Sequence, residues 1–193
     1  PSTVLALKRS LVFGKSVNEI FELQEGDNSI SMDGVFTPEE LAGYYNTTVI
    51  HDYMRTVLPD FDDMDFAMPV NVQITPHECN AFYNGSSINF YVGNGDCVSL
   101  VTVADVVFHE YGHGINDNFY QQFASNFSNG GMNEGYADVW GFFVNQDPVL
   151  GDGNNPNDAE DYVRRYDENP KVYPQDLVGQ VHADGEIIAG AWW

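Results

Sequence analysis

The sequence predicts an α+β fold with a β-rich N-terminal half, a central buried helix and the beginning of a mainly helical C-terminal half. Residues 70–92 alternate between apolar and polar positions, as strands do, whereas residues 103–115 and 132–144 carry the apolar spacing of buried helices. A chain of 193 residues, 43% of them hydrophobic, supplies one core or two halves that share a cleft. We place the halves at residues 1–115 and 116–193, and we expect the helical half to continue beyond the last residue.

The chain is strongly acidic, with 7 Lys and Arg residues against 29 Asp and Glu residues and a formal net charge of −22. Binding to nucleic acid or to anionic lipid relies on Lys and Arg, so we expect neither nucleic acid nor a membrane among the partners. Intrinsic disorder is also opposed, because 13 Phe, 11 Tyr and 3 Trp residues supply the apolar burial that disordered chains lack. These counts predict a folded acidic protein.

Two kinds of element are expected before the central helix. Apolar residues at helical spacing predict an amphipathic helix over residues 41–58, which Pro59 ends. The alternating stretch over residues 70–92 comes next, and turn residues at 84–86 and 93–96 divide it. This pattern predicts the strands of an antiparallel sheet.

The two cysteines, Cys79 and Cys97, lie on either side of a strong two-residue turn signal, Asn84-Gly85. Such a turn brings the flanking strands together, so we favour a disulfide across the hairpin over two free buried thiols. A disulfide in turn indicates an oxidising compartment.

The central helix is expected over residues 103–115, with Thr102 as its N-cap. The glycine pair at 130–131 is expected to break the chain before a second buried helix over residues 132–144. Asp, Asn, Gly and Pro crowd the loop at 147–168. Two interpretations of this loop stay open: a solvated connector, which we favour, and an oxygen-rich calcium site.

The central helix contains the sequence His-Glu-x-x-His, formed by His109, Glu110 and His113. Two histidines one helical turn apart project from nearly the same face and can reach a single ion, while the glutamate lies beside them. Unpaired polar groups in a buried helix cost free energy, and a metal ion is a partner that satisfies them. Catalytic zinc commonly takes three protein ligands and leaves the fourth position to water, so a third ligand is needed.

The best candidate for the third ligand is Glu134, on the second buried helix. A histidine ligand six positions after His113 is excluded, because Phe119 stands there. Asp138 lies one turn beyond Glu134 on the same helical face, where its carboxylate can accept the spare N–H of a zinc-bound histidine. An exposed acidic pair is the alternative, and it fits poorly among the apolar residues of this helix.

The segments HEYGH and NEGYAD resemble the motifs of the thermolysin-like and fungalysin-type gluzincins, a zincin-like family of secreted zinc endopeptidases. The resemblance extends to residues 80–85, 91–96 and 105–107, and to the segment VHADGE at 181–186. It covers most of residues 41–193.

This resemblance implies a fold, an activity and a set of site residues. The chain would hydrolyse protein or peptide substrates with one zinc ion, and its precursor would be a zymogen with an inhibitory prodomain. The implied roles are zinc ligand for His109, His113 and Glu134; general base for Glu110; oxyanion stabilisation for His182; orientation of His182 by Asp176; and substrate binding by Asn80, Ala81 and Arg165, the last weakly favoured over Arg164.

A rival interpretation is a non-catalytic acidic module, metal-binding or adhesive, that keeps the zinc helix as structure. The presence of Glu110 opposes it, because a structural zinc site closes with a fourth protein ligand and needs no base.

Overall fold

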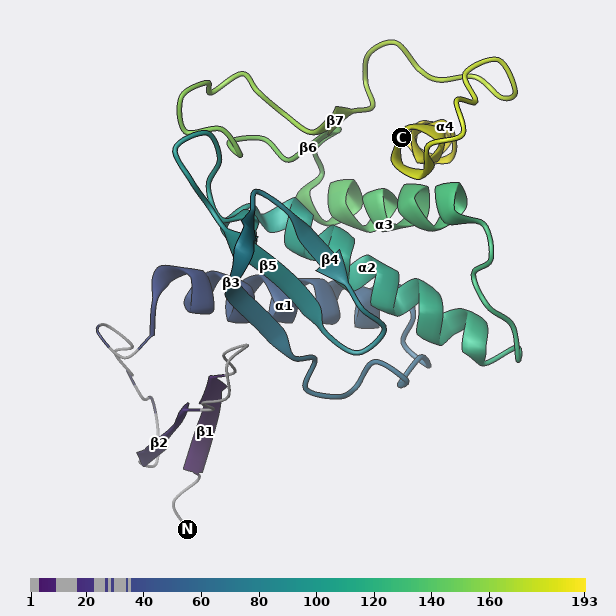
Figure 1. The fold of residues 1–193 in the computed structure, drawn as a ribbon. Helices are drawn as coiled ribbons and strands as arrows, with labels where there is room; N and C mark the ends of the chain where they lie inside the picture. Colours follow the sequence, from purple (N-terminus) through teal and green to yellow (C-terminus); the bar gives the residue numbers. More distant parts are fainter. Residues whose placement is uncertain (1–3, 10–16, 23–26, 28, 30–33, 35) are drawn as a thin grey trace.

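The computed structural model describes residues 4–9, 17–22, 27, 29, 34 and 36–193. It confirms the predicted mixture of helices and small sheets (Figure 1). Strands β1 (Val4–Arg9) and β2 (Val17–Glu22) form an antiparallel two-stranded sheet that precedes the helices and strands around the site. The division at residues 115 and 116 stays a prediction.

Helix α1 (Pro38–Val57) begins earlier than the apolar spacing predicts, because a capping box fixes its start. The Thr37 hydroxyl accepts a hydrogen bond from the Glu40 backbone N–H at 3.3 Å, and the Glu40 carboxylate accepts one from the Thr37 N–H at 2.8 Å. These bonds satisfy two backbone donors that a helix start leaves without partners. The helix ends just before Pro59, as expected.

The central sheet contains β3 (Val70–Glu78), β4 (Ala81–Tyr83) and β5 (Ile88–Val92) in the order β3-β5-β4. The antiparallel prediction holds for β4 and β5 but is wrong for β3, which runs parallel to β5. The reason is that the chain, after leaving β3 and before entering β4, crosses over the end of β5. Strands β3 and β4 therefore lie on opposite sides of β5. Strand β4 thereby becomes an edge of the sheet.

Helix α2 (Ala104–Gln121) carries the histidine motif, and its residues 105–116 are all buried. A 3-10 turn, η1 (Leu100–Thr102), leads into it, so Val103 occupies the N-cap position and the prediction of Thr102 is wrong. The Thr102 hydroxyl is already used within that turn, where it donates to the Ser99 carbonyl oxygen at 2.8 Å.

Helix α3 (Gly130–Asn145) starts at the glycine pair rather than after it. The prediction of a chain break was wrong because the Asn129 side chain caps this end and accepts from the Met132 N–H at 2.9 Å. Helix α4 (Val181–Trp192) packs on α3, and Gly135 permits the close approach. A Cβ atom at Gly135 would lie 2.2 Å from the Ile188 Cγ2 atom and 2.4 Å from the Gly185 carbonyl oxygen.

The helices form a stack in which α2 contacts α1 and the sheet on one side and α3 on the other, with α4 beyond α3 (Figure 1). A short antiparallel pair, β6 (Val149–Leu150) and β7 (Arg164–Arg165), lies beside α3 and α4. The main core cluster joins apolar residues of α1, α2 and the sheet.

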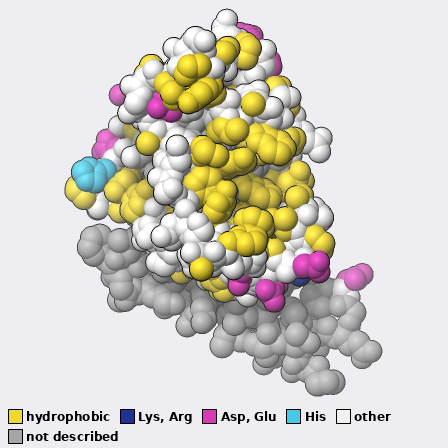
Figure 2. Space-filling view, turned by 90° about the vertical axis from the view of Figure 1, so that its right-hand side faces the viewer, with side chains coloured by type: hydrophobic (Ala, Val, Ile, Leu, Met, Phe, Trp, Pro, Cys, Tyr) yellow, Lys and Arg dark blue, Asp and Glu magenta, His cyan; other side chains and the backbone are white. Residues whose placement is uncertain are grey.

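Figure 2 shows one face on which hydrophobic side chains gather, and an apolar groove of about 400 Å³ lies between α1, α2 and α3. Within the described part of the chain, no helix is both long and apolar enough to cross a membrane.

Candidate metal centre

Three side chains from two helices bring their ligand atoms together. His109 and His113 of α2 face Glu134 of α3, and the three ligand atoms all lie within 4.8 Å of one another. The two Nε2 atoms are 3.1 Å apart, and the Glu134 Oε2 atom lies 3.3 Å from that of His109 and 3.7 Å from that of His113. For bonds of about 2.0–2.1 Å, two ligand atoms of a tetrahedral zinc ion lie roughly 3.3 Å apart. Among the described residues, this is the only group of three or more His, Cys, Asp or Glu side chains that could hold an ion.

The hydrogen bonds of the two histidines leave both Nε2 atoms free to bind a cation. The His109 Nδ1 atom lies 2.6 Å from an Asp138 oxygen, and the His113 Nδ1 atom lies 3.1 Å from the Asn133 side-chain oxygen. Both oxygens are acceptors, so we assign the ring proton to Nδ1 in each histidine and a lone pair to each Nε2. The Oε2 atom of Glu134 is buried and accepts no hydrogen bond. One cation would satisfy all three atoms, so the residues fit zinc.

The electrostatics of the cluster also favour one positive charge. Burial by itself lowers the pKa of His109, but the nearby carboxylates, above all Asp138, outweigh it and raise this pKa to about 10. Burial and the neighbouring His109 lower the pKa of His113 to about 4. Burial raises the pKa of Glu134, but the adjacent histidines outweigh it and keep this pKa below its usual value. The carboxylates around the histidines therefore favour a single positive charge at this point, which a cation bound at the Nε2 atoms would supply.

Asp138 occupies the position predicted for a group that orients a ligand. Its carboxylate is almost fully buried and accepts from the His109 Nδ1 atom, from the Arg164 guanidinium at 2.6 and 2.7 Å, and from the Tyr166 hydroxyl. Burial disfavours the charged form, but His109 and Arg164 outweigh it and hold the pKa of Asp138 well below its usual range. Sequence reasoning missed Tyr166.

The two adjacent arginines point to different surroundings. Arg164, which is mostly buried, reaches the cluster through Asp138. Arg165 pairs with Asp167 at 2.6 Å and with Glu168 at 3.3 Å, outside the cluster. The structure therefore brings Arg164, and not the favoured Arg165, to the candidate centre.

Glu110 is buried on α2 next to His109. Burial raises the pKa of Glu110 to about 7, although the charge of His109 and a backbone hydrogen bond from Tyr83 oppose this shift. A carboxyl group with a pKa near neutrality can accept and return a proton at physiological pH. Tyr83 belongs to β4, so this interaction also shows that the edge strand lies along the face of α2 that carries Glu110.

His182 reaches the cluster from the first turn of α4. Its Nε2 atom lies 3.4 Å from the Glu134 Oε2 atom. Gln180 fixes its tautomer: the Gln180 side-chain oxygen accepts from the Ala183 N–H at 2.6 Å, which turns the Gln180 amide nitrogen toward the His182 Nδ1 atom at 2.9 Å. The Nε2 atom of His182 therefore carries the ring proton and faces the cluster.

Asp176, the residue predicted to orient His182, makes a different contact. Its carboxylate accepts from the Val172 N–H at 2.6 Å. Gln180 occupies the predicted role instead. The sequence contains a signal for this role, because Gln180 stands just before a helix and the side chain of an N-cap residue accepts hydrogen bonds from backbone N–H groups of the first turn.

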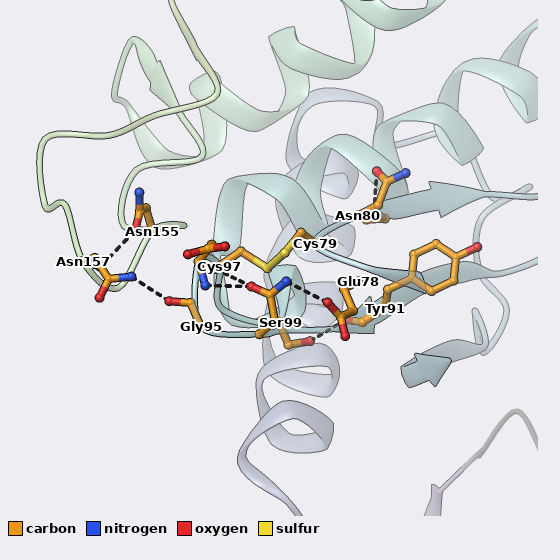
Figure 3. The surroundings of a disulfide bond; sticks show 12 residues. Glu78, Cys79, Asn80, Tyr91, Gly95, Cys97, Ser99, Asn155 and Asn157 are labelled. Atoms are coloured by element: carbon orange, nitrogen blue, oxygen red, sulfur yellow. Dashed lines mark hydrogen bonds between the residues drawn. A yellow bond between two sulfur atoms is a disulfide. The ribbon is translucent and has the colours of Figure 1, made fainter. Parts of the chain in front are cut away.

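The remaining predicted residues lie at the start of the edge strand. Asn80 immediately precedes β4, and its side-chain oxygen accepts from the Ala81 N–H at 2.9 Å. The predicted disulfide between Cys79 and Cys97 is present, with a Cα–Cα distance of 5.7 Å (Figure 3). The calcium interpretation of the loop at 147–168 stays a prediction.

Comparisons with known proteins identify the family of this chain. Residues 10–117 match the family model described as thermolysin metallopeptidase, catalytic domain. The chain is 31% identical over 114 residues to the neutral protease of Vibrio proteolyticus, and 30% identical over 114 residues to the virulence metalloprotease of Vibrio anguillarum. It is 38% identical over 73 residues to the extracellular metalloprotease of Pectobacterium carotovorum subsp. carotovorum.

Both Vibrio matches cover 58% of this chain but only 18% of the relative. The Pectobacterium match covers 35% of this chain and 19% of the relative. The chain thus spans less than a fifth of the length of these curated relatives. Among solved structures, the precursor of protealysin, a metalloproteinase from Serratia proteamaculans, superimposes with a TM-score of 0.55 at 23% identity, covering 75% of this chain and 45% of that one. This likeness shows the fold. Because the family model matches more than half of its residues, the chain belongs to the thermolysin metallopeptidase family.

Proposed function

We propose that the chain carries the catalytic centre of a secreted zinc endopeptidase that hydrolyses peptide bonds in proteins or peptides. The main support is the convergence of His109, His113 and Glu134 on one buried point, with Glu110 as an additional buried carboxyl group beside them. A zinc ion held there supplies a Lewis acid that polarises the peptide carbonyl and lowers the pKa of a water molecule toward neutrality.

The chain's own residues would perform the proton transfers and the charge stabilisation. Glu110 accepts the proton of the attacking water and returns it to the leaving amine, a task that suits a carboxyl group whose pKa is raised to about 7. His182 donates its Nε2–H to the carbonyl oxygen as negative charge develops on it, and Gln180 holds the required tautomer.

Substrate binding is proposed at the edge strand and at one arginine. Asn80 and Ala81 lie at the start of β4, which runs along α2 and can pair with an extended peptide backbone. Arg164 is the better candidate for a contact with a substrate carbonyl, because its guanidinium is fixed by Asp138 at the cluster. Arg165 is occupied by Asp167 and Glu168.

Secretion and synthesis as a zymogen with an inhibitory prodomain are also proposed. The names of the relatives include an extracellular metalloprotease, and the solved structure is that of a precursor. The disulfide of this chain is consistent with an oxidising compartment.

The rival, a non-catalytic module with a structural zinc site, is not favoured. Within the described part of the chain, the ligand group has three members, whereas a closed structural site has four.

Removal and restoration of the metal tests the proposal. The purified chain should hold one zinc ion and cleave an unfolded protein; dialysis against a chelator should abolish cleavage, and equimolar zinc should restore it. Zinc binds the folded chain in preference to the unfolded chain, so the chelator should also lower Tm. A chain that holds one zinc ion and cleaves no peptide would overturn the proposal.

A further inference from the structure

The passage from β3 to β4 crosses the end of β5 in two residues. Glu78, the last residue of β3, pairs with Val92, and Ala81, the first residue of β4, pairs with Phe90 on the opposite side of β5. Only Cys79 and Asn80 remain for the crossing. Cys79 has a φ of 55°, in the left-handed region. This conformation is strained for a residue other than glycine, so the surrounding structure must fix it.

The disulfide attaches the crossing to a compact loop at residues 93–99 (Figure 3). Within this loop the Asn94 side-chain oxygen accepts from the Cys97 N–H at 3.1 Å, and the Asn94 N–H donates to the Cys97 carbonyl oxygen at 2.9 Å. A Cβ atom at Gly93 would lie 2.6–2.7 Å from backbone atoms of residues 97–99, so the turn is closely packed. Cys79 is therefore bonded to a well-determined turn.

The loop at residues 93–99 is itself hydrogen-bonded to other parts of the protein. The Ser99 hydroxyl donates to the Tyr91 carbonyl oxygen at 3.0 Å, and the Val98 N–H donates to the Asn154 carbonyl oxygen at 2.8 Å. The chain then continues through η1 directly into α2, which carries His109 and Glu110. The disulfide thus connects the start of β4 with the start of the helix that bears the candidate catalytic residues.

Strand β4 has few bonds of its own to hold its place. It contains three residues and pairs only with β5, on one side. The backbone N–H of Tyr91 donates to the Asn80 carbonyl oxygen at 3.0 Å, and the backbone N–H of Asn84 donates to the Ser87 carbonyl oxygen at 3.2 Å. Hydrogen-bonded pairs alternate along an antiparallel ladder, so the backbone carbonyl groups of Ala81 and Tyr83 point away from β5, toward the free edge.

We infer that the Cys79–Cys97 disulfide positions the substrate-binding edge of β4 against α2 and thereby sets the affinity for the peptide substrate. The inference rests on the proposed function, in which Asn80 and Ala81 bind the substrate backbone. The bond acts on β4 and leaves the zinc ligands and Glu110 in place, because the packing of α2 and α3 holds these residues: His109, Glu110 and His113 are buried and Glu134 is half-buried. The contact of β4 with Glu110 is made by Tyr83, at the end of the strand farther from the disulfide.

The test is the double variant Cys79→Ala/Cys97→Ala, assayed with a fluorogenic peptide. We expect KM to rise roughly tenfold, because misplaced binding groups weaken substrate positioning, while kcat stays within about twofold. Bound zinc should remain at one equivalent. Backbone amides at residues 80–83 should exchange hydrogen faster than in the wild-type chain, and those of α2 should not. The matched control is Asn157→Ala, which removes the 2.6 Å bond from Asn157 to the Gly95 carbonyl oxygen but keeps the disulfide, and should leave KM unchanged.

Reduction of the wild-type chain by a phosphine, followed by reoxidation, repeats the test without a mutation. The rise in KM should appear on reduction and disappear on reoxidation. Three outcomes would overturn the inference: an unchanged KM with unchanged exchange at residues 80–83, a fall in kcat without a change in KM, or global unfolding on loss of the bond. A wild-type chain without activity would refute the proposed function instead, and the exchange measurement would still decide whether the disulfide positions β4.

Discussion

At the scale of single residues, the carboxylate of Asp138 links the candidate metal ligand His109 to Arg164 and Tyr166. All four acceptor positions of this buried carboxylate are used, by the His109 Nδ1 atom, two guanidinium nitrogens and the tyrosine hydroxyl. Such a group fixes the ring orientation and raises the basicity of a metal-binding histidine.

Asp138→Asn should therefore weaken zinc binding. The amide cannot accept from all four donors and would present its own N–H group to one of them. We expect zinc affinity, measured by competition with a chelator, to fall about 10–100-fold. Asp176→Asn is the matched control, because Asp176 accepts only from the Val172 N–H and lies outside the cluster. Equal zinc affinities of the two variants would contradict the role of Asp138.

The two arginines offer a second matched pair. Arg164→Lys keeps the charge but loses the two-pronged bond to Asp138, whereas Arg165→Lys changes an exposed ion pair. We expect kcat/KM for a peptide substrate to fall roughly tenfold or more in Arg164→Lys and to change by less than about twofold in Arg165→Lys. A larger loss in Arg165→Lys would return the substrate contact to Arg165.

These residues also show what sequence reasoning can reach. His109 and His113 could be placed together because helical periodicity fixes which side chains share a face, and Glu134 was added because catalytic zinc takes a third protein ligand. The choice between Arg164 and Arg165 could not be made, because adjacent residues of a strand point to opposite sides and only the fold decides which side faces the cluster. Gln180 was missed for another reason: its contacts with His182 and Ala183 are local, but no helix was predicted to begin after it.

At the scale of elements, the position of His182 depends on how closely α4 packs on α3. The contact is made at Gly135, where the space for a side chain is filled by Ile188 and by the Gly185 backbone. His182 stands in the first turn of the same helix, so a shift of α4 moves this residue relative to Glu134.

Gly135→Ala should therefore destabilise the chain and impair its activity. The added methyl group would meet backbone that cannot give way, so we expect a loss of about 1–3 kcal/mol in the free energy of unfolding. A fall in kcat should accompany it. Gly95→Ala is the control, because a Cβ atom at Gly95 would have no neighbouring atom within 4 Å. Denaturant titration and steady-state kinetics check both effects, and a Gly135→Ala variant as stable and active as Gly95→Ala would refute this account of the α3–α4 contact.

The elements themselves were largely predictable, and their ends and partners less so. Helices α1, α2 and α3 and the strands of the central sheet follow from apolar spacing, and the disulfide from a turn signal, whereas β6, β7 and α4 were not predicted. The parallel pairing of β3 and β5 was not predictable, since a local alternation pattern is the same for both directions of pairing. The capping box of α1 was present in the sequence as Thr37 and Glu40 but was not used.

At the scale of the whole molecule, the acidic composition and the buried site belong to different regions. The carboxylates of Glu110, Glu134 and Asp138 lie in or near the metal centre, whereas most other acidic residues with a described environment are exposed or half-buried. A net charge of −22 therefore describes mainly the surface, where it keeps like molecules apart. The proposed function depends instead on the few carboxylates at the candidate metal centre, Glu110, Glu134 and Asp138.

The proposed function requires that this chain hold one zinc ion and use Glu110 as the base in peptide hydrolysis. The most direct measurement compares the wild-type chain with Glu110→Gln, determining zinc content and the rate of cleavage of the same fluorogenic peptide. Glutamine keeps the size of the side chain but cannot accept the proton, so we expect one equivalent of zinc in both proteins and a rate reduced about 10²–10⁴-fold in the variant. A Glu110→Gln variant that cleaves the peptide as fast as the wild-type chain would contradict the account.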